Sequence, residues 1–145
     1  MKNIFGKRLK ELRKDRGLSM KQLSIQVGIS DSCISRWENG QTIVNGDQLI
    51  MFAKFFNVST DYLLGLESDK YPRRFRACPP FHEQLPILCE KLKTNKYQIQ
   101  KKTGIAESAI YNWQNGTSSP NIETIIKIAN AYGCSVDFVI GRSDV

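Results

Sequence analysis

The sequence predicts an all-α fold made of two tandem five-helix domains, and two observations carry this prediction. When the chain of 145 residues is shifted by 76 positions, it matches itself without a gap. About sixteen identities fall in roughly 57 aligned positions, among them Trp37 with Trp113 and Asn39 with Asn115. In both copies apolar residues recur at spacings of three and four, the period of an amphipathic helix. A repeat of this length is a whole small domain, so we assign 1–66 to the first domain, 67–80 to a linker and 81–145 to the second.

The first helix is predicted over 4–16, with Asn3 as its N-cap. Its apolar residues are spaced by four and three and form one face: Phe5, Leu9 and Leu12. A fourth helix is expected to begin near Asp47 and to end at Asn57, and Ser59 is expected to cap a short fifth helix. The residues between the first and fourth helices form the most informative part of the domain.

Residues 19–40 read as two short helices joined by a tight turn. Ser19 can cap the first of them, and Gln22 three residues later closes a capping box. Gly28 supplies the left-handed conformation that ends this helix, and Ser30 can cap the next one. The second helix has an apolar inner stripe and an outer face of polar residues: Asp31, Ser32, Ser35 and Arg36. This arrangement is a helix-turn-helix, the motif that places its second helix in the major groove of DNA.

The linker contains three prolines, which exclude a regular helix. Fully extended, it would span roughly 45 Å at about 3.3 Å per residue, more than the ~34 Å between successive major-groove faces. Three arginines flank Phe75 and are candidates for contacts to phosphate or to a minor groove: Arg73, Arg74 and Arg76. The alternative interpretation of this segment is a solvated basic linker.

In the second domain, Pro86 lies inside the region that matches the first helix. Because proline breaks a helix interior, we expect this helix to start or restart near Leu85, with 81–84 as a separate turn. Asn95 can cap the next helix, and the second helix of the pair is predicted from about Glu107 to Asn115.

The net charge and the lack of a long apolar run indicate which class of protein this is. The net charge is +7, divided as +4 for 1–66 (ten basic and six acidic residues), +2 for 67–80 (four and two) and +1 for 81–145 (seven and six). This excess fits a nucleic-acid partner, and its decline along the chain favours the first copy and the linker as the stronger phosphate binders. No apolar run approaches 18 residues and the start has no signal-peptide core, so we expect a cytoplasmic protein without a membrane partner.

The four cysteines lie far apart, with no Cys-x-x-Cys pair and a single histidine in the chain. This spacing favours reduced thiols over a metal site or a disulfide framework, with Cys33 and Cys134 interpreted as small core residues. With one histidine, no phosphate loop and no paired carboxylates in a Gly-rich setting, the sequence argues against an enzyme, and no cofactor is expected.

Both copies resemble the helix-turn-helix family of phage repressors and Cro proteins, also called the xenobiotic-response-element family. In the first copy the resemblance rests on Gln22-Leu23, Val27-Gly28-Ile29-Ser30, Ile34-Ser35-Arg36-Trp37-Glu38-Asn39-Gly40 and Val58-Ser59-Thr60-Asp61-Tyr62-Leu63-Leu64-Gly65. In the second it rests on Thr103-Gly104-Ile105-Ala106, Ile110-Tyr111-Asn112-Trp113-Gln114-Asn115-Gly116 and Val136-Asp137-Phe138-Val139-Ile140-Gly141. The resemblance implies two lambda-repressor-like DNA-binding domains and a sequence-specific DNA-binding transcriptional regulator, specifically a repressor.

The resemblance also implies which residues contact double-stranded DNA. The positions that match the family's base readers are Asp31, Ser32 and Arg36 with Ser35 nearby, and Glu107, Ser108 and Asn112 with Tyr111 nearby. Arg36 can donate to guanine, Asp31 can accept from cytosine and Asn112 can read adenine. The alternatives are a phosphate contact or a surface charge for Arg36, and for Asp31 a charge that favours the helix dipole. Because the two faces differ, a chain that uses both copies would prefer an asymmetric site.

Phosphate contacts are implied for Asn39 and Asn115, whose alternative role is in the turn after the helix, and for Lys96. Met20 stands at the position in the first copy that matches Lys96, which weakens that contact there. Trp37 and Trp113 lie on inward stripes and are interpreted as core residues.

The family has a buried salt bridge at the positions of Arg13 and Glu38, and the second copy has Cys89 and Gln114 there. Both charges are absent together, as expected if the pair interacts, because losing one alone would strand a buried charge at a cost of roughly 3–5 kcal/mol.

The resemblance implies a homodimer, and an intramolecular pseudo-dimer of the two copies is the alternative. A second functional hypothesis is that one copy is a protein-interaction or dimerisation module. The +1 charge of the second copy and its Glu107–Tyr111 face make it the candidate.

Overall fold

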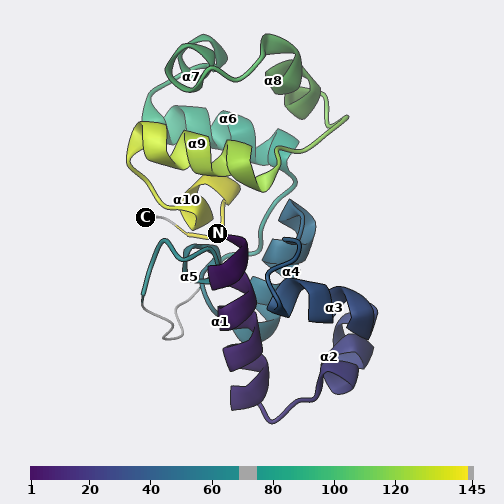
Figure 1. Cartoon of the computed structure of the whole chain (residues 1–145). Helices are drawn as coiled ribbons and strands as arrows, with labels where there is room; N and C mark the ends of the chain where they lie inside the picture. Colours follow the sequence, from purple (N-terminus) through teal and green to yellow (C-terminus); the bar gives the residue numbers. More distant parts are fainter. Residues whose placement is uncertain (69–74, 144–145) are drawn as a thin grey trace. The chain divides into compact units, whose positions relative to one another are not determined.

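The structure is a computed structural model that describes residues 1–68 and 75–143. Within these ranges it contains ten α-helices and no strand (Figure 1), which confirms the all-α prediction. The chain divides into two compact units, Met1–Arg73 and Arg74–Val145. Each unit contains five of the helices and has a core of its own.

The first unit contains α1 (Lys2–Asp15), α2 (Met20–Val27), α3 (Asp31–Glu38), α4 (Gly46–Phe56) and α5 (Thr60–Leu63). Helix α1 packs on α3 and α5, α2 packs on α3, and α4 packs on α5. Phe52 lies at the centre of an aromatic core, with its ring centroid 6.5 Å from that of Phe5 and 5.7 Å from that of Trp37. The amphipathic stripes predicted from the sequence therefore meet in one buried cluster.

The second unit contains α6 (Phe81–Leu92), α7 (Lys96–Thr103), α8 (Glu107–Gln114), α9 (Ile122–Tyr132) and α10 (Val136–Ile140). Helix α6 packs on α8 and α10, and α9 packs on α7 and α10. The core is mostly aliphatic, and its fully buried apolar side chains include Leu88, Ile99, Ile110, Ile128 and Val139. The same fold is thus filled with different side chains in the two units.

Four of the predicted helix caps are confirmed. The side chains of Ser19, Ser30 and Ser59 each accept a hydrogen bond from a backbone N–H in the first turn of the helix that follows. Asn95 caps α7 in the same way. Each of these bonds satisfies one of the N–H groups that a helix leaves without an intrahelical partner, so short helices of four to eight residues begin at defined positions.

Two predicted helix starts are wrong. Helix α1 begins at Lys2 rather than after Asn3, because the Met1 carbonyl accepts the first helical hydrogen bond, from Phe5 N at 3.0 Å. No side chain caps this helix, since Met1 has no side-chain oxygen. Helix α6 is continuous from Phe81 through Pro86, so 81–84 is not a separate turn.

Tertiary contacts explain why α6 extends through its proline. The Phe81 ring packs edge-on against Trp113, with 5.7 Å between ring centroids. Gln84 is buried and its Nε2 donates to the Phe138 carbonyl at 3.4 Å. These contacts hold the first turn against the core. They offset the stability lost because Pro86 has no N–H to donate to the helix.

Part of the predicted linker belongs to the second unit. Arg76 N donates to the Arg142 carbonyl at 2.8 Å, and the Cys78 thiol donates to the Ile140 carbonyl at 3.0 Å. The guanidinium of Arg142 lies over the Phe75 ring, 4.1 Å from its centroid. The sequence-based reach of roughly 45 Å counted these residues as extended, so it is too long.

The prediction that Cys33 and Cys134 are core residues is wrong, since both side chains are only partly buried. Cys33 lies on α3, beside residues of its outer face, and Cys134 directly follows Gly133, the C-cap of α9. Among the described residues no disulfide joins any of the cysteines.

Candidate nucleic-acid interface

Helices α2 and α3 form the predicted helix-turn-helix of the first unit. Ser19 Oγ accepts from Gln22 N at 3.0 Å, and Gln22 Oε1 accepts from Ser19 N at 2.8 Å, which completes the capping box. Gly28 ends α2 with φ at 72°, a left-handed conformation that glycine adopts without strain. Ser30 Oγ then accepts from Cys33 N at 3.3 Å and starts α3. These interactions fix where α2 ends and where α3 begins, and so define the turn between the two helices.

The two sides of α3 differ sharply in exposure. Ile34 and Trp37 face the core and are 0% and 6% exposed. Asp31, Ser32 and Arg36 are exposed and Ser35 is half-buried, so the structure places all four predicted residues on the outer side. The core role predicted for Trp37 is confirmed, and the outer side of α3 is polar and largely exposed.

An ion pair holds α3 against α1. Arg13 Nε donates to Glu38 Oε2 at 2.7 Å and Arg13 Nη2 donates to Glu38 Oε1 at 2.9 Å, with the two side chains only 9% and 3% exposed. The hydrogen bonds that Arg13 donates to Glu38 raise the pKa of Arg13 above its ordinary value. Arg13 Nη1 also donates to the Leu18 carbonyl at 2.8 Å, so one guanidinium joins α1, α3 and the start of the motif.

Gly6 allows α1 to approach the end of α3 closely. A Cβ atom at this position would lie 2.3 Å from the Trp37 carbonyl oxygen and 2.8 Å from that of Glu38. The matching residue of the second unit is His82, so α6 and α8 meet without this backbone approach. The first motif is therefore attached to its domain by a glycine contact and an ion pair that the second motif lacks.

Helices α7 and α8 form the second helix-turn-helix. Gly104 ends α7 with φ at 73°, but Ala106 precedes α8 and provides no side-chain cap. Trp113 is 3% exposed, which confirms its predicted core role. On the outer side Glu107, Ser108 and Tyr111 are exposed, with Tyr111 at 60%, and Asn112 is half-buried. The four predicted residues of this unit also share one face.

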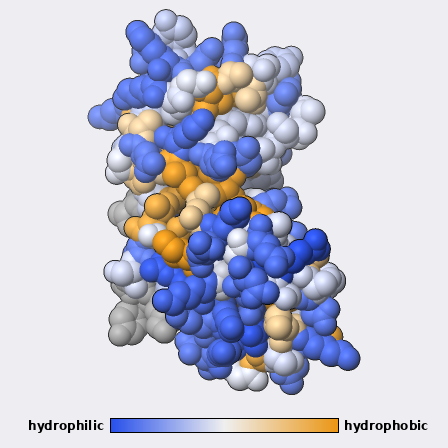
Figure 2. Space-filling view, viewed as in Figure 1, coloured by the Kyte–Doolittle hydropathy of each residue, from blue (hydrophilic) through white to orange (hydrophobic). Residues whose placement is uncertain are grey.

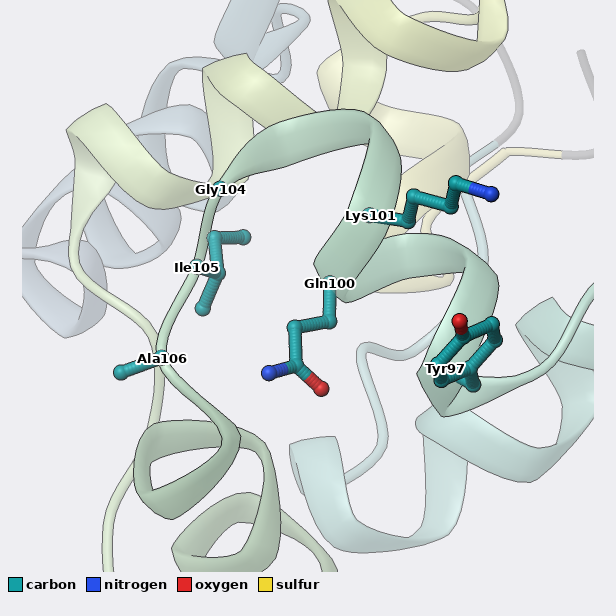
Figure 3. Close-up of a pocket in the computed structure, with 6 residues that line it drawn as sticks. All are labelled: Tyr97, Gln100, Lys101, Gly104, Ile105 and Ala106. Atoms are coloured by element: carbon teal, nitrogen blue, oxygen red, sulfur yellow. The ribbon is translucent and has the colours of Figure 1, made fainter.

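A shallow cleft of about 410 Å³ opens beside the start of α8, and its lining residues are drawn in Figure 3: Tyr97, Gln100, Lys101, Gly104, Ile105 and Ala106. The Gln100 side chain extends from α7 toward the Ile105–Ala106 segment, and Lys101 points away from that segment (Figure 3). Sequence reasoning missed Tyr97 and Gln100. An aromatic residue on the polar outer side of a predicted helix was the available signal for Tyr97, which is 63% exposed.

The remaining predicted contact residues lie around these two motifs. Asn39 and Asn115 are the exposed C-cap residues of α3 and α8, and Lys96 is the exposed first residue of α7. The Arg76 side chain is exposed at the edge of the second unit. Arg73 and Arg74 lie outside the described residues.

Basic residues cover the outer side of α1 near the first motif. Lys7, Lys10 and Lys14 are all exposed, and Figure 2 shows the hydrophilic surface over this helix. None of the described helices is long and apolar enough to cross a membrane.

Comparison with known proteins gives one family and several relatives. Two segments of the chain, 9–63 and 87–139, match the helix-turn-helix family model. The uncharacterized HTH-type transcriptional regulator YobD of Bacillus subtilis (strain 168) is 36% identical over 70 residues, which are 48% of this chain and 62% of the relative. The HTH-type transcriptional activator BcrR of Enterococcus faecalis is 38% identical over 63 residues, 43% of this chain and 31% of the relative.

Repressor protein C2 of Salmonella phage P22 is 36% identical over 61 residues, 42% of this chain and 28% of the relative. The chain thus matches less than two thirds of the length of each of these relatives. No solved structure gives a significant match.

Proposed function

The chain belongs to the helix-turn-helix family of non-enzymatic, DNA-binding transcriptional regulators, and on that basis we propose that it represses transcription by binding a specific sequence in double-stranded DNA. One observation supports sequence reading above all others. In both units the second helix of the motif has a buried tryptophan on one side and exposed polar residues on the other. A helix of this kind fits the major groove, where each base pair presents a distinct pattern of donors and acceptors.

The proposed base-reading residues occupy matching positions on the two recognition helices: Asp31, Ser32, Ser35 and Arg36 on α3, and Glu107, Ser108, Tyr111 and Asn112 on α8. The proposed phosphate contacts are Asn39, Asn115, Lys96 and Arg76, together with Arg73 and Arg74. Phosphate contacts position a protein on the duplex, and base contacts give it sequence preference.

Repression requires only that the protein occupies a promoter. Among the relatives, one is named a repressor and one an activator. The resemblance to phage repressors favours repression for this chain. Its target would be cytoplasmic DNA, bound by a homodimer or by one chain acting as an intramolecular pseudo-dimer.

A second candidate function concerns the second unit alone. Tyr97 and Tyr111 are more than half exposed on the outer side of α7 and α8. Aromatic residues are enriched at protein interfaces, and the charge of +1 over 81–145 is the lowest of the three segments. These observations favour a protein-interaction or dimerisation role if the second unit does not read bases.

Selection of bound DNA from a random pool with the full chain tests the proposal, and native mass spectrometry of the complex gives its stoichiometry. We expect an enriched motif whose affinity falls steeply with salt. Alanine substitution of Glu107, Ser108 and Asn112 should alter the preferred bases in one part of the enriched DNA sequence. Matched substitutions of Glu123 and Asn130, which are exposed on α9, should leave the motif unchanged.

An unenriched pool would contradict the proposed function. An enriched motif that the α8 substitutions do not alter would assign base reading to the first unit and the interaction role to the second. In a promoter–reporter assay, increased expression in the presence of the protein would contradict repression and leave DNA binding intact.

A further inference from the structure

The two recognition helices are alike at their first two positions and unlike at their fifth and sixth. Asp31 and Glu107 are both carboxylates, and a serine follows each of them. At the sixth position α3 has Arg36 and α8 has Asn112. Any difference in base preference between the units therefore comes from the fifth and sixth positions of the recognition helix, which we call the register position.

Arg36 presents donors only. Its side chain is exposed, and among the described residues its one hydrogen bond is from Nη2 to the Cys33 Sγ at 3.5 Å, a weak acceptor. The other N–H groups of the guanidinium have no hydrogen-bond partner among the described residues. Guanine presents two adjacent acceptors, N7 and O6, in the major groove, which match a guanidinium fork. Adenine places an N–H₂ donor at the second of these points and therefore repels the same fork.

Asn112 presents one donor and one acceptor. Its side chain is half-buried at the matching register position, and no hydrogen bond to its amide is present in the part of the second unit that the structure describes. Adenine offers the complementary pair, an N7 acceptor and an N6 donor. The neighbouring residue reinforces this preference, because Tyr111 is 60% exposed where the first unit has the half-buried Ser35. A tyrosine ring is a suitable apolar partner for the thymine methyl group, which only A·T pairs present.

We propose that the two units read unlike half-sites, and that the residue pair Arg36 and Asn112 sets the difference. The first unit prefers a G·C pair at this register position. The second prefers an A·T pair, with a thymine methyl against Tyr111. This inference rests on the proposed function and deepens it, since it identifies the class of operator as one in which each chain reads two dissimilar half-sites.

Exchange of the two side chains tests the inference in the full chain. Selections are run with the wild type, with Arg36→Asn, with Asn112→Arg and with both changes. Arg36→Asn should replace guanine by adenine at one position of the first half-site, and Asn112→Arg should replace adenine by guanine in the second. Each exchange should lower affinity for the original operator by about 5- to 150-fold and restore it on the exchanged operator.

Two charge-matched controls separate base reading from general electrostatics. Lys54→Asn removes one positive charge from the exposed end of α4, and Asn130→Arg adds one on α9. Both controls should change affinity uniformly across sequences and leave the preferred bases unchanged.

The outcomes distinguish the inference from the proposed function. If the wild type enriches a motif but the exchanged variants keep its base preferences, the inference fails and the proposed function stands. The same holds if the two units of one chain read identical half-sites, or if Asn112→Arg leaves the motif unaltered because the second unit contacts a protein instead. Variants that lose all binding without gaining a new preference also contradict the inference, because it requires exchange rather than loss. A pool without any motif overturns both.

Discussion

Replacement of Arg13 by alanine should unfold the first unit selectively. Arg13 makes two hydrogen bonds to the Glu38 carboxylate, at 2.7 and 2.9 Å, and one to the Leu18 carbonyl at 2.8 Å. The Glu38 side chain is 3% exposed, so water cannot replace the lost guanidinium. The substitution therefore leaves a buried carboxylate and a backbone carbonyl without their partner.

The expected loss of stability is large for a unit of this size. Breaking a buried ion pair by removing one partner costs about 3–5 kcal/mol, and the unpaired carbonyl adds about 1 kcal/mol. A domain of roughly 66 residues is stable by about 3–10 kcal/mol, taking about 0.05–0.15 kcal/mol per residue. The substitution thus removes between about half and all of the folding free energy of the first unit.

The two tryptophans permit an assay in the full chain, because each unit has one of them in its core. In a Trp113→Phe background, the fluorescence of Trp37 reports unfolding of the first unit in urea. In a Trp37→Phe background, Trp113 reports unfolding of the second. With a urea dependence near 1 kcal/mol per molar for a small domain, a loss of about 4–6 kcal/mol means that Arg13→Ala should lower the midpoint of the first unit by about 4–6 M or unfold it in water.

Two comparisons make the test selective. Cys89 occupies the matching position of the second unit, is half-buried and has no ionic partner to strand, so Cys89→Ala should cost about 1 kcal/mol or less. The double change Arg13→Cys with Glu38→Gln copies the second unit and should be less damaging than Arg13→Ala alone, because no charge is left buried. Equal losses in the two units, or a double variant no more stable than Arg13→Ala, would refute the reasoning.

Three further predictions concern other contacts. Gly6→Ala should destabilise the first unit by about 1–3 kcal/mol, because its Cβ would lie 2.3 Å from the Trp37 carbonyl oxygen, and urea unfolding measures this change. Arg142→Ala should destabilise the second unit by about 3–5 kcal/mol, since it removes the ion-pair partner of the Asp137 carboxylate, which is 2.8 Å from Arg142 Nη1 and 3% exposed; an unchanged Trp113 transition would contradict this. Cys33 should react with iodoacetamide at lower pH than Cys89. Hydrogen bonding from Ser30 and Arg36 lowers the pKa of the Cys33 thiol, and burial raises that of Cys89, so the reactive thiolate of Cys33 forms first as pH rises; coincident pH profiles measured by mass spectrometry would argue against it.

The parts of the fold that were predictable depend on short-range interactions. Ser19 and Gln22 are three residues apart, and their capping box forms whatever the rest of the chain does. Gly28 and Gly104 have the positive φ that the turn requires, and the inward stripes contain Trp37 and Trp113. For the same reason the outer positions of α3 and α8 could be assigned to one face before the structure was known.

The prediction at Pro86 was wrong because the turn before it has partners far away in the sequence. Pro86 was expected to interrupt a helix, but Trp113 and the Phe138 carbonyl hold the turn that precedes it. The cleft beside Gln100 was not foreseen, because its shape depends on how α7 meets the Ile105–Ala106 segment.

The sequence by itself determined the duplicated all-α plan, the capped ends of its short helices and the polar outer sides of the recognition helices. These features follow from periodicity and from hydrogen bonds between residues at most four apart. Only the tertiary structure decided that α6 is continuous, and that Phe75 packs over the buried Arg142 although the segment containing it reads as a linker. Such features depend on contacts that form only when the chain is folded, since a hydrophobic surface or a buried charge is stabilised by whatever residue covers it, however distant in sequence.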